Sequence, residues 1–179
     1  IRTLFARSLR YEFQGGADFG IELHCLSSAH SHYSGSLILF HGTTWDSKYW
    51  LESAWLDLLN IAKQRNIQVI VPWGNSAEQQ LATKLTQQSG WGIVLPKLSI
   101  WELAGITSRC LGAVGVDTGL THLAAAIGTP TVAIFGSTSS KLTGAHGRRV
   151  ISLQSTLECS PCMKKVCPLT TDNRPPCYL

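Results

Sequence analysis

Apolar residues along the chain gather in short runs, of which 37–40 is unbroken, separated by longer stretches with helical spacing. The runs are typical of strands buried on both faces of a sheet, and they lie at 37–40, 68–72, 91–96, 112–116, 131–135 and 150–153. Between them, apolar residues recur every three or four positions, which predicts amphipathic helices at 51–62, 77–89, 100–109 and 120–127. Ser99 is the expected N-cap of the third helix. Upstream, we expect a short helix and linker over 1–13, a break at 15–18 and a strand at 20–26.

This alternation of strands and helices predicts an α/β fold, a Rossmann-like parallel sheet with helices on both faces. Polar turns follow the predicted strands at 41–48, 73–78, 115–122 and 136–140. Because the carboxyl ends of parallel strands meet at one edge of the sheet, these turns should lie together there, where open α/β sheets bind ligands. We therefore expect a binding site at this edge, and its turns favour an anionic ligand.

The stretch 112–122 reads as a strand, a tight turn and the start of a helix. Gly119 would allow a turn that a Cβ atom would crowd. The first N–H groups of such a helix form a natural site for a diphosphate. Asp117, Thr118 and His122 would surround the mouth of the turn. The alternative is that Asp117 or Thr118 caps the helix and His122 is an ordinary surface residue.

A second strand–turn–helix unit carries hydroxyls and a cation at 41–48. Thr43 and Thr44 can donate hydrogen bonds to phosphate oxygens, and Lys48 can neutralise their charge. The alternative is that Thr44, Asp46 or Ser47 caps the following helix while Lys48 is solvated.

Glu78 lies in the first turn of the helix predicted at 77–89. A carboxylate there complements the helix dipole, which is its structural interpretation. Its functional interpretation is a hydrogen-bond acceptor for ligand hydroxyls.

Composition narrows the function classes. The 179 residues are 44% hydrophobic and 15% charged, which is typical of one globular domain. The net charge of +4 is too small to indicate nucleic-acid binding, but it suits an anionic ligand or membrane surface. The sequence has neither GxGxxG after the first strand nor a P-loop, so hydride transfer with a dinucleotide and P-loop NTPase chemistry are not indicated. The sequence begins at Ile1 without a signal-peptide pattern or initiator Met, and we expect it to be part of a longer protein.

Four of the six cysteines crowd into the last 24 residues with the spacing C-x2-C-x4-C-x9-C: Cys159, Cys162, Cys167 and Cys177. In an intracellular protein this crowding indicates a metal site before disulfides. Four thiolates would hold a structural zinc and leave no open position for catalysis. Free thiols or oxidised pairs are the alternatives.

Two motifs, HGTTWDSKYW at 41–50 and GVDTGLTHL at 115–123, resemble those of the lipopolysaccharide heptosyltransferases, more closely the type I enzymes. The segment GSTSSKLTG at 136–144 is also similar, and RTLFARSL at 2–9 looks like the segment that joins the two halves of those enzymes. The resemblance implies one half of a GT-B glycosyltransferase. It divides the chain into an interdomain linker and helix at 1–18, a donor-binding domain at 19–155 and a cysteine-rich tail at 156–179.

The resemblance also implies a function and a set of residues. The donor would be ADP-L-glycero-D-manno-heptose, and the acceptor the Kdo-lipid A core of lipopolysaccharide. Reaction would invert the anomeric centre without a required cofactor. The donor site would comprise Thr43, Thr44, Lys48, Glu78, Asp117, Thr118, Gly119 and His122. The general base belongs to the other half of such enzymes, so this chain would hold no catalytic residue and would bind donor without transferring it.

Three further expectations accompany this interpretation. The protein would be cytoplasmic, with peripheral contact at the inner membrane as an open alternative to a solvated surface for the basic residues Arg148, Arg149, Lys164 and Lys165. No nucleic-acid partner is expected. The competing functions are another GT-B nucleotide-sugar enzyme, such as a UDP-sugar transferase or epimerase, and a non-catalytic nucleotide-binding module.

Overall fold

The computed structural model describes residues 2–12, 19–22, 24, 26, 30–170 and 175–178. Its strands are β1 (Leu37–Phe40), β2 (Val69–Val71), β3 (Ile93–Val94), β4 (Gly112–Val116), β5 (Thr131–Phe135) and β6 (Val150–Gln154). Its α-helices are α1 (Arg2–Leu9), α2 (Glu52–Gln64), α3 (Ser76–Ser89), α4 (Ile100–Thr107), α5 (Gly119–Ile127) and α6 (Ser140–Thr143). Short 3₁₀ turns are η2 (Ser31–Tyr33), η3 (Asp46–Lys48) and η4 (Pro176–Tyr178).

The six strands form one parallel sheet in the order β3-β2-β1-β4-β5-β6. This is the strand order of dinucleotide-binding folds, in which ligands occupy the crevice where the order reverses. Here the reversal falls between β1 and β4, whose last paired residues are Phe40 and Gly115. The expected α/β class is confirmed, and the topology places the turns after β1 and β4 side by side.

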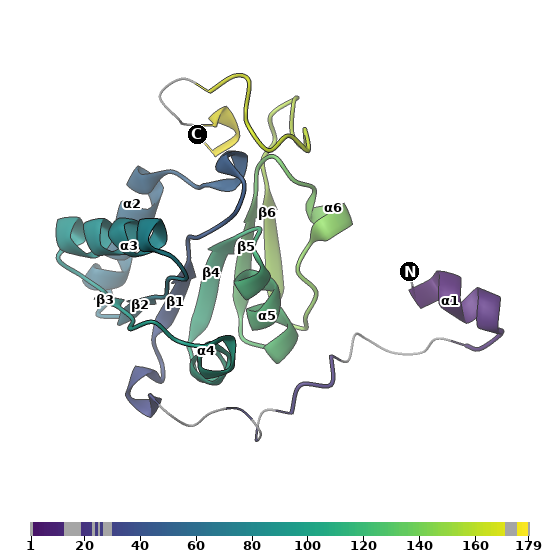
Figure 1. Cartoon of the computed structure of the whole chain (residues 1–179), viewed down its shortest axis with the longest axis horizontal. Coiled ribbons are helices and arrows are strands. Elements are labelled where there is room, and N and C mark those ends of the chain that lie inside the picture. Colours follow the sequence, from purple (N-terminus) through teal and green to yellow (C-terminus); the bar gives the residue numbers. More distant parts are fainter. Residues whose placement is uncertain are drawn as a thin grey trace.

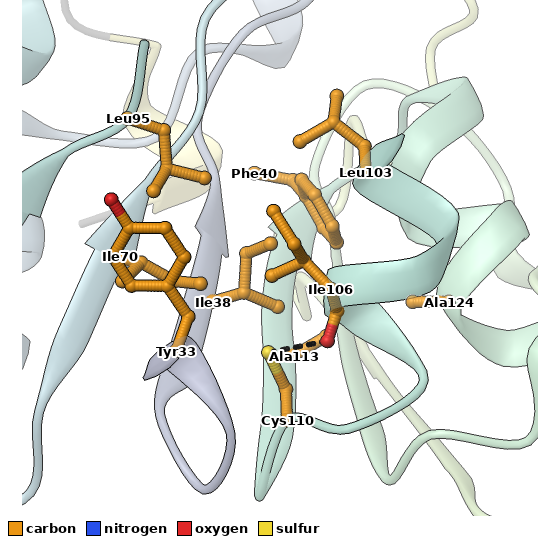
Figure 2. Packing of buried hydrophobic residues seen from close by; sticks show 10 residues of the cluster. All are labelled: Tyr33, Ile38, Phe40, Ile70, Leu95, Leu103, Ile106, Cys110, Ala113 and Ala124. Atoms are coloured by element: carbon orange, nitrogen blue, oxygen red, sulfur yellow. Dashed lines mark hydrogen bonds between the residues drawn. The ribbon is translucent and has the colours of Figure 1, made fainter. Parts of the chain in front are cut away.

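Alternate residues of the central strands pack on opposite faces of the sheet. Ile38 and Phe40 join a core cluster with Leu103 and Ile106 of α4, which Figure 2 shows from close by. The opposite face packs on α2 and α3, as the two groups of helices in Figure 1 illustrate; its cluster includes Leu39, Val71, Trp55, Leu59, Ala82 and Leu85. Each face of the sheet therefore has its own apolar layer, as the mostly apolar runs of the central strands predict.

Helix α4 begins as the sequence predicts. Ser99 accepts a hydrogen bond from the N–H of Glu102, and the Glu102 carboxylate accepts one from the N–H of Ser99. Because Ser99→Ala removes one half of this capping box, we expect the free energy of unfolding to fall by about 1 kcal/mol. Urea denaturation would measure the change. A loss indistinguishable from that of Ser108→Ala, at the other end of α4, would contradict it.

The strand expected at 20–26 is wrong for the residues that the structure describes there. Residues 20–22, 24 and 26 form no strand, and the six strands of the sheet all come from residue 37 onward. The break expected at 15–18 lies outside the described residues. Strand β3 is also shorter than predicted, because only Ile93 and Val94 pair with β2.

None of the described helices is both long enough and apolar enough to cross a bilayer.

Candidate functional site

The turns after β1 and β4 bring three predicted side chains into contact. The Lys48 ammonium in η3 lies 2.9 Å from one carboxylate oxygen of Asp117, which follows β4. The other oxygen of Asp117 lies 3.2 Å from Nε2 of His122 in the first turn of α5. Asp117 and Lys48 are nearly buried, with 6% and 14% of their side chains exposed, whereas His122 is 39% exposed. The cluster therefore opens to solvent on its histidine side.

These contacts decide between the interpretations left open for the two turns. Helix α2 begins after Leu51, which has no capping side chain, and Thr118 makes no side-chain cap to α5. Asp117 uses its carboxylate on Lys48 and His122 instead. The capping alternatives for both turns are wrong, and so is the alternative of a solvated Lys48.

Asp117 is held as an anion. Burial by itself raises the pKa of its carboxyl. Hydrogen bonds from His122 and Lys48 and the charge of Lys48 outweigh this effect and lower the pKa from the ordinary value of 3.8 to about 2. Lys48 also lies with its ammonium 4.4 Å from the centre of the Trp45 ring, a cation–π arrangement. Carboxylate and aromatic ring thus fix the cation at the edge of the sheet.

The N-terminus of α5 adds donors beside this cluster. The N–H groups of Thr121 and His122 both bond to the carbonyl of Thr118. Those of Gly119 and Leu120 stand at the helix start, where no helical acceptor precedes them. They and the positive end of the helix dipole suit an anion.

The expected reason for glycine at 119 is wrong. A Cβ atom at Gly119 would meet no atom within 4 Å, and its backbone does not lie in the left-handed region. The position is exposed and open, so glycine there keeps the approach to the helix N-terminus clear. The crowded glycine is Gly115, where a Cβ would lie 2.9 Å from the Cβ of Phe40 and against the Thr121 hydroxyl.

Thr43 and Thr44 lie between β1 and η3 on the same edge of the sheet. The Thr43 carbonyl accepts a hydrogen bond from the Tyr49 hydroxyl at 2.9 Å, which ties the turn to the residue after η3. Thr44 is exposed. Their hydroxyls as phosphate ligands stay a prediction.

Glu78 links the turns after β1 and β2. Its carboxylate accepts hydrogen bonds from the N–H of Gly74 and the amide of Asn75, at 2.7 and 2.9 Å. A Cβ at Gly42 would lie 2.5 Å from the Glu78 carboxyl carbon, so only glycine lets this carboxylate approach the β1 turn. Glu78 lies in the first turn of α3 as expected, and its carboxylate holds the neighbouring turns together. A contact with ligand hydroxyls stays a prediction.

His41 is a buried member of the site that the sequence analysis missed. Only 1% of it is exposed, and its Nε2 lies 3.0 Å from the carbonyl of Glu78. Because a carbonyl only accepts, Nε2 carries the hydrogen, while Nδ1 is buried without a partner. Burial lowers the pKa of His41, in accord with a neutral ring. The signal available in the sequence was a histidine directly after a buried strand.

The cysteine-rich tail packs on this same edge of the sheet, as Figure 1 shows. Ser47, 1% exposed, donates from its hydroxyl to the Lys164 carbonyl at 2.6 Å, and its N–H donates to the Lys165 carbonyl. The Tyr178 hydroxyl donates to the Lys48 carbonyl at 3.2 Å. The sequence analysis considered Ser47 only as a helix cap and did not name Tyr178, because nothing in their local pattern shows that they contact segments 117 and 130 positions away.

The four tail cysteines are free thiols. Burial raises the pKa of Cys177 to about 11, and the charges of Cys167, Cys162 and Cys159 raise it as well. Among the residues that the structure describes, no three Cys, His, Asp or Glu side chains already stand in the geometry of a metal site. Zinc binding by the tail stays a prediction.

A cavity of about 900 Å³ lies beside the Lys48 cluster rather than at it. Its walls come from residues 46–47 and 49–53, from Leu81 and Lys84 of α3, and from the tail at Val166, Cys167, Thr170 and Pro175. Lys48, Asp117 and His122 are not among the residues that line this cavity. We therefore assign the candidate site from the side chains of the Lys48 cluster and not from the size of this cavity.

Comparison of the chain with known proteins identifies its family. Residues 1–171 match the family described as "Glycosyltransferase family 9 (heptosyltransferase)". Over 167 residues the chain is 39% identical to lipopolysaccharide heptosyltransferase 1 of Pseudomonas aeruginosa, covering 93% of this chain and 47% of that relative. It is 34% identical to the enzyme of the same name from Escherichia coli K12 over 148 residues, covering 82% and 46%. The chain thus spans about half the length of these relatives.

The solved structures to which the chain is similar belong to the same family of enzymes. The structure "E. coli heptosyltransferase WaaC with ADP" matches with a TM-score of 0.76 at 32% identity, covering 86% of this chain and 48% of that one. The same enzyme with ADP-2-deoxy-2-fluoro heptose matches with a TM-score of 0.72 at 31% identity, over the same shares. A parallel sheet in the order of dinucleotide-binding folds, a fixed cation beside a helix N-terminus and these relatives lead to one conclusion: the chain belongs to glycosyltransferase family 9, the heptosyltransferase family.

Proposed function

We propose that this chain is the donor-binding half of an inverting heptosyltransferase and that it holds ADP-L-glycero-D-manno-heptose. The observation that carries the proposal is the fixed Lys48–Asp117 pair beside the N-terminus of α5, at the reversal point of the sheet. A diphosphate needs a cation and several N–H donors at one place, and this edge offers both. The ADP and ADP-sugar in the WaaC structures fit the same ligand class.

Each group would act on the charge that develops during transfer. When an acceptor hydroxyl attacks the anomeric carbon, the bond to ADP breaks and negative charge grows on the leaving diphosphate. Lys48 and the N–H groups of Gly119 and Leu120 would stabilise that charge, with the Thr43 and Thr44 hydroxyls as further donors. This stabilisation requires no metal ion.

The remaining predicted residues would orient the rest of the donor. Asp117, an anion even in mild acid, would keep Lys48 in place and meet the heptose with Thr118 and His122. Glu78 would accept hydrogen bonds from the nucleoside. A general base from the other half of the enzyme would complete catalysis, so this chain alone would bind donor without transferring heptose. In the whole protein the acceptor would be Kdo-lipid A, at the cytoplasmic face of the inner membrane.

Calorimetric titration of this chain with ADP and with UDP tests the proposal. We expect saturable binding of ADP and weaker binding of UDP, because the predicted nucleoside site is that of an adenine nucleotide. Preference for UDP would assign the chain to another nucleotide-sugar enzyme. If a folded sample binds neither, a chain extended upstream by the partner half decides the matter: binding there supports the proposal, and none overturns it.

A further inference from the structure

The ring of His41 is buried at the point where β1 ends and the candidate site begins. Only 1% of the residue is exposed, although it lies between the apolar strand Leu37–Phe40 and the turn that carries Thr43, Thr44 and Lys48. Burying an imidazole is unfavourable unless its nitrogen atoms find partners. Here Nδ1 has no hydrogen-bond partner among the described residues. An apolar residue would avoid this penalty, so packing alone does not explain the histidine.

The other ring nitrogen ties the end of β1 to the first turn of α3. Nε2 of His41 donates to the backbone carbonyl of Glu78 at 3.0 Å, across 37 positions of the sequence. Glu78 belongs to the first turn of α3. Because a ring that is 1% exposed has little room to move in a close-packed interior, this hydrogen bond holds the turn at a fixed place relative to β1.

The carboxylate of Glu78 is held separately, by the turn after β2. It accepts hydrogen bonds from the N–H of Gly74 and the side-chain amide of Asn75, at 2.7 and 2.9 Å. It also lies over Gly42, the residue after His41, where a Cβ would be 2.7 and 2.9 Å from the two carboxylate oxygens. A carboxylate has about four acceptor positions, so two hydrogen bonds leave others for a ligand.

We propose that His41 is a positioning residue for the nucleoside end of the donor. Through the Glu78 carbonyl, it holds the Glu78 carboxylate where the hydroxyl groups of the nucleoside reach it. This role rests on the proposed function, in which Glu78 accepts hydrogen bonds from the nucleoside. His41 itself would not touch the ligand, because its ring is buried. A displacement of about 1 Å in the first turn of α3 would weaken the carboxylate–hydroxyl hydrogen bonds, since these depend steeply on distance.

Calorimetric titration with ADP and with inorganic pyrophosphate tests this role in the native chain, His41→Gln, His41→Asn and His41→Leu. The amide nitrogen of glutamine can replace Nε2, whereas that of asparagine lies nearer the place of Nδ1. We expect His41→Leu and His41→Asn to weaken ADP binding about three- to tenfold, the value of one neutral hydrogen bond, and His41→Gln to keep near-native affinity. Pyrophosphate affinity should stay unchanged, because pyrophosphate has no nucleoside.

A double-mutant cycle shows whether His41 acts through the carboxylate. Glu78→Ala removes the carboxylate but keeps the carbonyl to which His41 donates. In that background His41→Leu should change ADP affinity by less than about twofold, because the group that His41 positions is gone. A loss as large as in the native background would overturn the role of His41 as a positioning residue.

The other outcomes separate this role from the proposed function. Equal losses of ADP and pyrophosphate affinity in His41→Leu would indicate a general distortion of the turn after β1 and overturn the role. Native ADP affinity in His41→Leu would overturn it as well and leave the proposed function standing. If His41→Leu does not fold, the difference between His41→Gln and His41→Asn decides. The variants are measured in whichever chain binds ADP, the native one or the one extended upstream. Binding by neither overturns the proposed function and this role together.

Discussion

Replacing Lys48 with alanine should weaken ADP binding by about 10- to 100-fold, since charge-assisted hydrogen bonds are worth roughly 1.5–3 kcal/mol. Asp117 lies 2.9 Å from the ammonium, and an ammonium has three hydrogens, so two remain for a ligand. Unlike a free surface lysine, this one is fixed by a carboxylate and an aromatic ring, so little side-chain entropy is lost when a ligand binds. Calorimetry at fixed ionic strength measures the change.

Lys63→Ala is the matched control. Lys63 belongs to the last turn of α2, where its ammonium donates to the Ser89 carbonyl, away from the edge that carries the cluster. The two variants lose the same charge, so net charge alone cannot separate them. Comparable losses of ADP affinity in both would contradict a specific role for Lys48.

Replacing Asp117 with asparagine should remove an acid-sensitive part of the stability. The folded pKa of about 2 lies below the ordinary value of 3.8, so the native ion pair contributes about 2 kcal/mol above that value. This contribution is lost as the pH falls from about 4 through 2. The unfolding free energy of the native protein should therefore approach that of Asp117→Asn over this range.

Urea denaturation of both proteins at pH 5, 3 and 2 measures the difference. Other carboxyl groups titrate equally in the two proteins, so subtraction isolates Asp117. Asp57→Asn, on α2, is a control whose difference from the native protein should not follow this course. A difference between the native protein and Asp117→Asn that stays constant from pH 5 to 2 would show that the ion pair does not hold Asp117 ionised.

The sequence by itself determined the class of the fold and which turns would carry polar groups. The run 37–40 is apolar at every position, as expected for a strand covered on both faces, and the spacing of 51–62 fits one helical face. Because parallel strands align their carboxyl ends, the sequence alone predicts that the turns at 41–48 and 115–122 lie at one edge of the sheet. Strand and helix periodicity are local, so the chain displays them directly.

Only the tertiary structure decided which side chains contact one another. Lys48 and Asp117 are separated by 69 positions, and whether they cap helices or form an ion pair depends on β1 and β4 being neighbours. The neutral ring of His41, the open space at Gly119 and the contact of Tyr178 with the Lys48 turn likewise follow from packing between distant segments. Local pattern cannot give them, because burial and hydrogen-bond pairing are set by the strand order of the sheet.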